Sequence, residues 1–438
     1  MDYEVLASLI SLPGYFTTRV TGRVMNRVKQ CLLVTFDFTQ RGKSATSFAA
    51  GVLLSACKQH QFYGETFIAD HLSIEMSGNK VQNLTVGEIA NRINNHYKLE
   101  KLQGLALGCY VWNTDMIEPL IQKCREKGFK GNIILGGYQI HESTCKTLYP
   151  SGDIYLPSYG EVSLPEAFMH EKVLNKLILS KKVDFSLLNS PYLNGSIGLD
   201  ENQPMIHWET QRGCFYACSF CAHRDVTNNK VHDFRLETVK KELRLFKKKN
   251  VQRINVLDPI FRKGRRSYEI LEYAIEIGLK AQLVFQVRFE DINERLLDLF
   301  SRLSTHLEFG LQTAIKAESV IINRRNNVEK VSSAIAMLQQ KRMSFEVSLI
   351  YGLPTQTLES FSQSIQFLQE RGVSNIKAFP LMLLEGTQLS EEMDKYGIKE
   401  GYIDDSEIPH VVECDSFTNE EWIAMSELAK TLTYQEAS

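Results

Sequence analysis

Short apolar runs alternate with amphipathic stretches over residues 31–170. Runs with the length of buried strands occur at 31–36, 67–69, 102–109, 132–135 and 153–156. Stretches with apolar residues at helical spacing occur at 47–57, 86–97 and 115–126. Strands that alternate with helices through short loops predict a doubly wound, flavodoxin-like parallel sheet. Ligands of such a sheet bind at the carboxyl ends of its strands.

The same alternation returns over residues 205–385. Predicted strands lie at 207–210, 251–257, 283–287, 306–310, 345–351 and 376–383. Predicted helices lie at 236–246, 296–303, 328–341 and 358–370. Strand and helix units of this length predict an open, partial (β/α)6 barrel, whose chemistry is expected at the carboxyl ends of the strands.

These two patterns divide the chain into five parts. The predicted parts are an N-terminal extension at 1–30, the sheet domain at 31–170, a linker rich in turn residues at 171–204, the barrel at 205–385 and an acidic cap at 386–438. One helix is expected in the cap, near 420–432.

Composition excludes several classes of protein. The chain has 438 residues, 43% hydrophobic and 23% charged, which is ordinary for a globular protein. A net charge of -2 argues against a general nucleic-acid binder. The absence of a long apolar run argues against a membrane span, and Asp2 and Glu4 argue against a signal peptide. Six of the nine cysteines are scattered without pattern, which favours a reducing cytoplasm over a disulfide framework.

The other three cysteines form a C-x3-C-x2-C loop at the start of the barrel. Cys214, Cys218 and Cys221 offer clustered thiolates, which bind iron–sulfur clusters or zinc. With His223 as a fourth ligand the loop would be a structural zinc site, and without a metal the cysteines would be core residues. Three cysteines leave one iron of a 4Fe–4S cluster open to another ligand.

This spacing, with Phe220 directly before the last cysteine, resembles the radical S-adenosylmethionine (SAM) superfamily. The resemblance covers the whole predicted barrel and implies a 4Fe–4S cluster whose open iron chelates SAM. It also implies SAM contacts at the strand ends, from Phe220, Asp258, Gln286, Arg288, Glu308, Gln312, Arg324 and Gly352. Arginine suits the SAM carboxylate because it pairs in bidentate fashion. Each of these residues taken alone also has a structural interpretation.

The loops of the first domain resemble those of the cobalamin-binding domain that precedes the barrel in cobalamin-dependent radical SAM enzymes. The resemblance implies cobalamin contacts from Thr39, Tyr110, Trp112, Asn113, Gly136, Gly137, Gly160 and Glu161. Glycine lets the backbone approach a large ring closely, although a glycine pair also simply ends a strand. Thr39 stands where many of these domains have a cobalt-binding histidine, so we expect the lower cobalt face to be water-bound or empty. His71 is a lesser candidate ligand.

The expected function is therefore that of a cytoplasmic radical SAM enzyme with cobalamin-dependent methyl transfer to a small molecule or natural product. An electron donor such as flavodoxin or ferredoxin is implied, and neither nucleic acid nor membrane is expected as a partner. One alternative keeps the fold and carries out cyclisation, ring rearrangement or aminocarboxypropyl transfer, as in arsinothricin-type biosynthesis. Another is a zinc-stabilised binding protein without catalysis. Two features have open roles, Cys414 as a buried thiol or radical contact and 262–266 as a solvated loop or anion contact.

Overall fold

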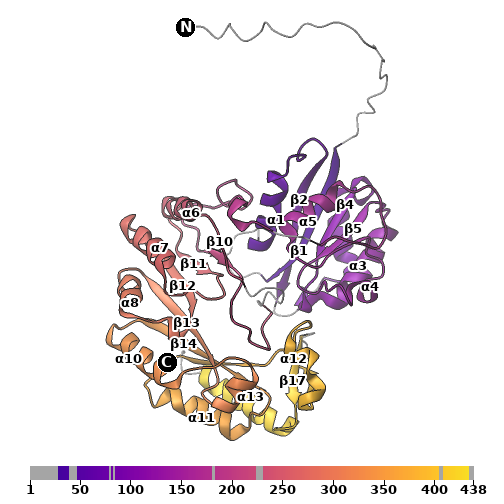
Figure 1. Cartoon of the computed structure of the whole chain (residues 1–438). Coiled ribbons are helices and arrows are strands. Elements are labelled where there is room, and N and C mark those ends of the chain that lie inside the picture. Colours follow the sequence, from indigo (N-terminus) through magenta and orange to yellow (C-terminus); the bar gives the residue numbers. More distant parts are fainter. Residues whose placement is uncertain are drawn as a thin grey trace, which may run out of the picture.

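The computed structural model describes residues 28–38, 47–77, 80–81, 84–179, 183–222, 230–403 and 408–433 (Figure 1). Thr39 and His223 lie outside the described residues, as does almost all of the predicted N-terminal extension. None of the helices in the described part is both long enough and apolar enough to cross a membrane.

The first domain is built on one sheet with the strand order β3-β2-β1-β4-β5-β6-β7. Its strands are β1 Lys29–Phe38, β2 Phe67–Ser77, β3 Lys80–Val81, β4 Gly104–Gly108, β5 Asn132–Gly136, β6 Ile154–Leu156 and β7 Lys176–Leu177. All neighbours are parallel except β2 and β3. The five central strands have the flavodoxin-like order, so the predicted fold class is confirmed. The order reverses between β1 and β4, which is where such sheets bind ligands.

Helices cover both faces of this sheet. They are α1 Phe48–Gln59, α2 Val86–Tyr97, α3 Thr114–Glu126, α4 Cys145–Leu148 and α5 Gly160–Met169. The apolar side chains of α1 and α5 form one core with Leu33, and those of α2 and α3 form the other core with Val34. Adjacent residues of β1 therefore face opposite cores, as the pleat of a strand requires. Single 3₁₀ turns lie at η1 Leu99–Lys101 and η2 Val111–Asn113.

Strand β2 is much longer than the predicted 67–69. It pairs with β1 in register from Lys29 with Phe67 to Phe38 with Met76. Polar residues such as Asp70 and Ser73 interrupt its apolar pattern, which is why the sequence predicted only the apolar start of the strand at 67–69. His71 consequently lies within the strand and not in a loop after it.

The barrel is a six-stranded parallel sheet in simple chain order. Its strands are β8 Met205–Trp208, β11 Arg253–Val256, β12 Gln282–Val287, β13 Thr305–Gln312, β14 Ser344–Tyr351 and β15 Ile376–Pro380. Its helices are α6 Leu236–Lys248, α7 Arg265–Glu276, α8 Glu294–Ser301, α9 Lys316–Ile321, α10 Val328–Gln340 and α11 Leu358–Gln369. Within the described sheet β8 and β15 do not pair with each other, so the predicted open (β/α)6 barrel is confirmed. A turn at η4 Phe289–Asp291 follows β12.

Helix α7 was not predicted. Its first turn is basic, and its buried face consists of Ser267, Ile270, Leu271 and Ala274. The run at 262–266 thus forms the loop before α7 and the first turn of the helix.

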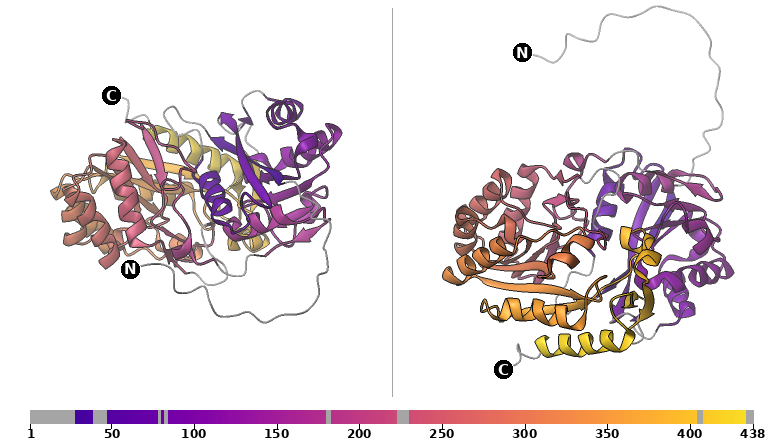
Figure 2. Two further views of the ribbon diagram at one scale, coloured as in Figure 1. Left: turned by 90° about the horizontal axis from the view of Figure 1, so that it is seen from above. Right: turned by 60° about the horizontal axis from the view of Figure 1, so that its bottom comes forward.

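The C-terminal part contains more than the one predicted helix. Besides α13 Asn419–Thr433 it has α12 Gln388–Glu391, η5 Met393–Tyr396 and an antiparallel hairpin of β16 Lys399–Tyr402 and β17 Pro409–Glu413. Helix α13 packs across β15 and beside α11 (Figure 2). Val411 and Leu381 are both buried, and the backbone N–H of Val411 donates to the carbonyl of Leu381. The hairpin thereby closes the end of the barrel beyond β15.

Residues 183–204 connect the two domains and pack on both. The 3₁₀ turn η3 Phe185–Leu187 starts this connection. Asn194 Nδ2 donates to the Ser55 hydroxyl of α1 at 2.7 Å, and that hydroxyl donates to the Asn189 carbonyl at 2.9 Å. On the barrel side, Ser190 Oγ donates to Glu242 of α6 at 2.5 Å. The connection is thus fastened to a helix of each domain.

Candidate functional site

The loop with the three cysteines leaves the carboxyl end of β8 and is anchored by Asp258. One oxygen of this carboxylate accepts hydrogen bonds from the backbone N–H groups of Thr210 at 2.7 Å and Gln211 at 3.1 Å. The other oxygen accepts from the Thr210 hydroxyl at 2.5 Å. Asp258 is only 1% exposed, and its burial raises its pKa to about 7. This predicted SAM contact therefore holds the start of the cysteine loop in place.

Further contacts fix the loop itself. The Ser219 N–H donates to the Ile322 carbonyl at 3.0 Å, and Asn323 Nδ2 donates to the Ala217 carbonyl at 2.8 Å. The Leu389 N–H of α12 donates to the Ser219 carbonyl at 2.9 Å. Segments from β13–α10 and from the cap therefore hold the loop from two sides. The short strands β9 Gln211–Arg212 and β10 His232–Asp233 flank it.

The three thiols of the loop differ in their exposure. Cys218 is 5% exposed, and Cys214 and Cys221 are partly buried. Among the described residues, a group of three potential ligand atoms within 4.8 Å of one another is formed by His306, Glu308 and Glu346, and not by the three cysteines. Sulfur ligands of a tetrahedral zinc ion lie about 3.8 Å apart, as follows from a zinc–sulfur bond of about 2.3 Å. Among the described residues the three cysteines therefore do not already stand at the spacing of zinc ligands.

Two arginines lie against the cysteine loop. Arg324 Nη1 donates to Cys218 Sγ at 3.7 Å, and its Nη2 donates to the Gly310 carbonyl. Arg288, only 4% exposed, lies over the ring of Tyr216 at 4.1 Å and pairs with Glu290 at 3.1 Å. Burial raises the pKa of the Cys214 thiol, and both guanidinium groups oppose this shift. They would favour thiolates in this loop.

Two polar atoms beside the loop have no hydrogen-bond partner although they are buried, Arg324 Nε and Ser219 Oγ. Buried donors of this kind are rarely left unsatisfied in a folded protein. The sulfides of a cluster or the carboxylate of an amino acid would supply acceptors at this position. The residues present therefore fit an anionic group next to Cys218.

A pocket of about 280 Å³ opens beside Phe220 inside the barrel. Four of the predicted SAM residues line it, namely Phe220, Gln286, Glu308 and Gln312. Successive parallel strands β12 and β13 bring these side chains together, since Gln286 and Glu308 are register partners. Gly310 also lines the pocket, so Arg324 adjoins it through the Gly310 carbonyl.

Gly352 lies outside this pocket. Its φ is +88°, and a methyl group at this position would lie 3.0 Å from the Val411 carbonyl oxygen. Gln356 accepts hydrogen bonds from the N–H groups of Gly352 at 2.8 Å and Leu353 at 3.2 Å. In this structure the segment 352–357 shapes the turn after β14 and seats the hairpin of the cap.

The residues predicted to contact cobalamin fall into two groups. Tyr110, Trp112, Gly136 and Gly137 lie at the carboxyl ends of β4 and β5, and the rings of Tyr110 and Trp112 stack at 4.6 Å with an angle of 4°. Asn113 is buried and ties this turn together, because its Nδ2 donates to the Gly108 carbonyl at 2.9 Å. Gly137 has a φ of +117°, and a methyl group there would overlap the Cys109 carbonyl.

Gly160 and Glu161 form the second group, at the start of α5. A methyl group at Gly160 would lie 2.7 Å from Leu53 of α1, so this glycine permits close helix packing. Glu161 forms an ion pair with Arg212, whose other nitrogen pairs with Glu209 at 2.6 Å. Burial opposes the charge of Arg212, but the two carboxylates outweigh it and raise its pKa. Glu161 therefore links the first domain to the residue two positions before Cys214.

The minor candidate His71 is hydrogen-bonded within the first sheet. Its Nε2 lies 2.8 Å from the Thr35 hydroxyl, which in turn donates to Asp37 at 2.5 Å. Burial lowers the pKa of His71.

Cys414 is buried, and its Sγ lies 3.2 Å from the Ser416 hydroxyl.

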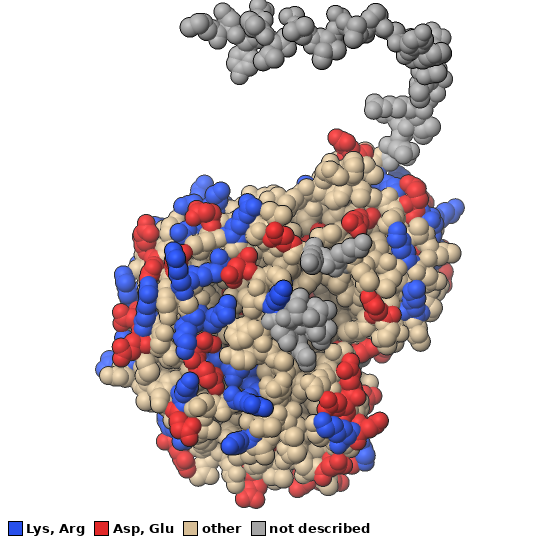
Figure 3. Space-filling model, viewed as in Figure 1, with Lys and Arg blue, Asp and Glu red and all other residues tan. Residues whose placement is uncertain are grey.

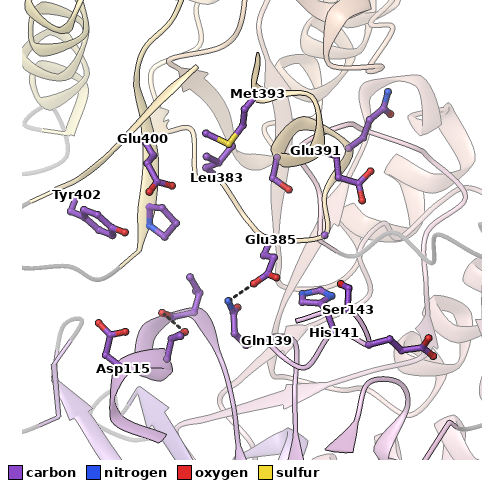
Figure 4. Close-up of a pocket in the computed structure, with 17 residues that line it drawn as sticks. Asp115, Gln139, His141, Ser143, Leu383, Glu385, Glu391, Met393, Glu400 and Tyr402 are labelled. Atoms are coloured by element: carbon purple, nitrogen blue, oxygen red, sulfur yellow. Dashed lines mark hydrogen bonds between the residues drawn. The ribbon is translucent and has the colours of Figure 1, made fainter. Parts of the chain in front are cut away.

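A cavity of about 1380 Å³ lies between the first domain and the cap (Figure 4). Gln139 from the loop after β5 donates to Glu385 from the loop after β15 at 3.1 Å, and the Tyr138 hydroxyl donates to the Glu385 carbonyl at 3.3 Å. Burial, followed by the charges of Cys221 and Glu385, raises the pKa of Tyr138 to about 12. Tyr138 thus joins the first domain to the loop after β15.

The sequence did not identify this cavity. No local pattern in the chain pairs the loop after β15 with the loop after β5. A methyl group at Gly386 would lie 2.6 Å from the His141 ring, and the φ of Gly386 is +76°. The two loops pack closely at this glycine. In the sequence alone Gly386 has no feature that indicates a contact with His141.

Comparison with known proteins agrees with these two domains. Residues 208–368 match the radical SAM superfamily. The cobalamin-dependent radical SAM methyltransferase TokK of Streptomyces tokunonensis is 23% identical over 345 residues, 67% of this chain and 49% of TokK. The 2-(S-pantetheinyl)-carbapenam-3-carboxylate methyltransferase of Streptantibioticus cattleyicolor is 21% identical over 373 residues, 73% of this chain and 54% of that protein. The chain thus spans about half the length of these curated relatives.

Solved structures share the fold of both domains. The radical SAM methyltransferase TsrM from Kitasatospora setae, solved with tryptophan and a SAM analogue, superposes with a TM-score of 0.67 at 12% identity over 86% of this chain and 79% of TsrM. The cobalamin-dependent radical enzyme OxsB, with aqua-cobalamin and SAM bound, superposes with a TM-score of 0.59 at 15% identity over 84% of this chain and 56% of OxsB. Residues 208–368 therefore match the radical SAM superfamily, and both domains of the chain share the fold of TsrM and OxsB.

Proposed function

We propose that the protein is a cobalamin-dependent radical SAM methyltransferase that acts on a small molecule. The observation that carries this proposal is the position of the cysteine loop. It lies at the carboxyl mouth of the open barrel beside the pocket at Phe220, and Gln139 of the first domain is hydrogen-bonded to Glu385 at the end of the barrel. The names of TokK and TsrM support methyl transfer as the outcome.

Three sets of residues would hold the reactants. Cys214, Cys218 and Cys221 would bind a 4Fe–4S cluster, and Arg324 would pair with the carboxylate of SAM. Gln286, Glu308 and Gln312 would hydrogen-bond the polar groups of the same molecule inside the barrel. The loops after β4 and β5 would hold a corrinoid at the sheet edge, where Gly137 lets its backbone approach closely.

When bound, the cluster supplies the electron that cleaves SAM, and the corrinoid carries the methyl group. The chain contributes position and shielding. Asp258 fixes the loop that holds the cluster, and Glu161 with Arg212 fixes that loop relative to the first domain. The cap and the loop after β5 line the space between the domains, where a bound substrate would be partly shielded from water.

Anaerobic reconstitution with iron and sulfide, followed by incubation with SAM, dithionite and hydroxocobalamin, tests the proposal. We expect a brown protein that releases 5′-deoxyadenosine and S-adenosylhomocysteine, and hydroxocobalamin that stays with it in gel filtration. Cys218→Ala should abolish both products. A colourless protein with one zinc would reject the cluster. Methylthioadenosine in place of S-adenosylhomocysteine would instead indicate aminocarboxypropyl transfer.

A further inference from the structure

Residues 322–324, which follow α9, contact residues 217–219 of the cysteine loop one to one. Two of these contacts are the hydrogen bonds to the loop backbone described above, at 3.0 and 2.8 Å. The third joins Arg324 Nη1 to Cys218 Sγ at 3.7 Å. The backbone N–H of Arg324 also donates to the Ser319 carbonyl of α9 at 2.8 Å. The position of Arg324 beside the cysteine is therefore set by the backbone on both sides of the contact.

The guanidinium of Arg324 bridges the cysteine loop and β13. Its Nη2 donates to the Gly310 carbonyl, while Nη1 donates to the Cys218 sulfur. A methyl group at Gly310 would lie 3.2 Å from Nη2, so this glycine leaves the room that the guanidinium occupies. Two contacts from different segments thus fix the orientation of the positive group.

The charge of Arg324 has no counter-ion in the described part of the chain. No carboxylate oxygen of the described residues lies within 4.0 Å of its nitrogens, whereas the neighbouring Arg288 pairs with Glu290 at 3.1 Å. On the surface of the barrel half, Lys and Arg side chains are interspersed with Asp and Glu side chains (Figure 3). Cys218 is only 5% exposed, so water screens the charge of Arg324 weakly at this sulfur.

Two donors beside Cys218 lack an acceptor, as noted above. Arg324 Nε is buried without a partner, and so is the hydroxyl of Ser219, a residue that is 4% exposed. Because buried donors are rarely left unsatisfied, these atoms indicate an anionic group at this place. The contact of Arg324 with Cys218 therefore belongs to a larger set of donors around one cluster ligand.

We propose that Arg324 raises the reduction potential of the cluster through its contact with Cys218 Sγ. This inference rests on the proposed function, because it requires the cluster to be bound by the three cysteines. An external reductant that gives one electron adds one negative charge to the cluster and its thiolates. A cation and an N–H donor at a ligand sulfur stabilise this more negative state more than the oxidised state. Arg324 acts through Cys218 and is in this respect a positioning residue.

This role is separate from the proposed contact of Arg324 with the SAM carboxylate. A guanidinium has five N–H groups, of which Cys218 and Gly310 each take one. The remaining three can serve the carboxylate. The effect on the potential is therefore measured without SAM, and the effect on SAM binding is measured on its own.

Three variants separate charge from shape at this position. Arg324→Met removes the charge and all the donors, and Arg324→Lys keeps the charge but not the planar fork. The matched control is Arg325→Met, the same substitution at the next residue, whose side chain is exposed. Arg324→Gln takes the place of Arg324→Met if circular dichroism shows that Arg324→Met does not fold.

The midpoint potential is measured on protein reconstituted with iron and sulfide, without SAM or corrinoid. The signal of the reduced cluster in electron paramagnetic resonance is titrated with titanium(III) citrate and redox mediators. For Arg324→Met we expect the equilibrium constant for one-electron reduction to fall by about 10-fold, which lowers the potential by about 59 mV. Arg324→Lys should show less than half of this shift, and Arg325→Met should match the parent protein. SAM binding to each protein is measured by calorimetry.

Three results would overturn the inference. An unchanged potential in Arg324→Met would do so, and weaker SAM binding in that variant would then leave Arg324 with the carboxylate alone. Equal shifts in Arg324→Met and Arg324→Lys would mean that the shape of the loop sets the potential. Neutral variants that bind no cluster, or that do not fold, would assign Arg324 to the support of the loop. Failure of the proposed function differs from all three, because the parent protein itself would then give no cluster signal.

Discussion

Arg212 joins the two domains through a buried ion pair with Glu161, and removing its charge should be costly. Arg212 is 20% exposed in its side chain, and its partners Glu161 and Glu209 are 5% and 15% exposed. The guanidinium also lies 5.0 Å from the centre of the Phe185 ring and 5.9 Å from that of Phe234. Arg212→Met keeps much of the apolar length of the side chain but leaves both carboxylates without their cation.

The expected cost follows from the burial of these groups. Breaking a buried ion pair from one side costs about 3–5 kcal/mol, since the remaining charge is left unpaired. The residual exposure of Arg212 and Glu209 places the value near the lower end, at about 3 kcal/mol. Loss of the contacts with the two rings adds about 0.5–1 kcal/mol. We therefore expect Arg212→Met to destabilise the fold by about 3–4 kcal/mol.

Urea denaturation of the cluster-free chain, followed by tryptophan fluorescence, measures this cost. Trp208 is buried in the barrel four residues before Arg212, so the barrel transition is the one to follow. The triple variant Glu161→Gln/Glu209→Gln/Arg212→Met removes every charge of the network and should recover most of the loss. A destabilisation below about 1 kcal/mol, typical of a surface pair, would refute the reasoning. A triple variant as unstable as the single one would refute it as well.

Three further changes test other parts of the structure. Asp258→Asn should remove a pH dependence of stability. Burial raises the pKa of Asp258 above its unfolded value, so its contribution to stability falls as the pH rises from about 4 to 7. The melting temperatures of parent and variant, measured across this range, should therefore converge on the acid side. Gly386→Val should push the His141 ring away and weaken the contact of the cap with the first domain, which faster hydrogen exchange in the loop after β5 would report. Gly137→Ala combines an unfavourable φ with an overlap at Cys109, so a loss of about 2–4 kcal/mol and weaker hydroxocobalamin binding are expected. Melting curves unchanged by Gly137→Ala would contradict that expectation.

The sequence predicts most strongly where one local pattern decides the structure. Strand and helix periodicity located both sheets, and the position of residues after each strand brought Gln286, Glu308 and Gln312 into one pocket. This works because parallel strands present their carboxyl ends at a common edge. The spacing of the three cysteines likewise depends on nothing outside its own loop.

Prediction was weaker where the environment of a residue comes from distant parts of the chain. Asp258 and Gly352 stand at strand ends, as SAM contacts would, yet one anchors Thr210 and the other packs on Val411. The polar residues of β2 and the basic first turn of α7 mask two elements in which only one face is buried. The contact of Gln139 with Glu385 joins residues that no local pattern relates.

The packing of the interdomain connection also sets where this chain can be cut and recombined. Ile197 fills the space beside Gly51 of α1, and Asn194 is hydrogen-bonded to Ser55 of the same helix. A chimaera that exchanges the N-terminal domain at residue 171 would separate α1 from the side chains that evolved against it. A junction at 198–204 keeps the connection together with α1. The contacts that then have to be matched to the barrel include those of Ser190 with Glu242, of Tyr192 with Phe246 and of Glu161 with Arg212. For this architecture the unit of exchange is therefore the first sheet together with the connection that follows it.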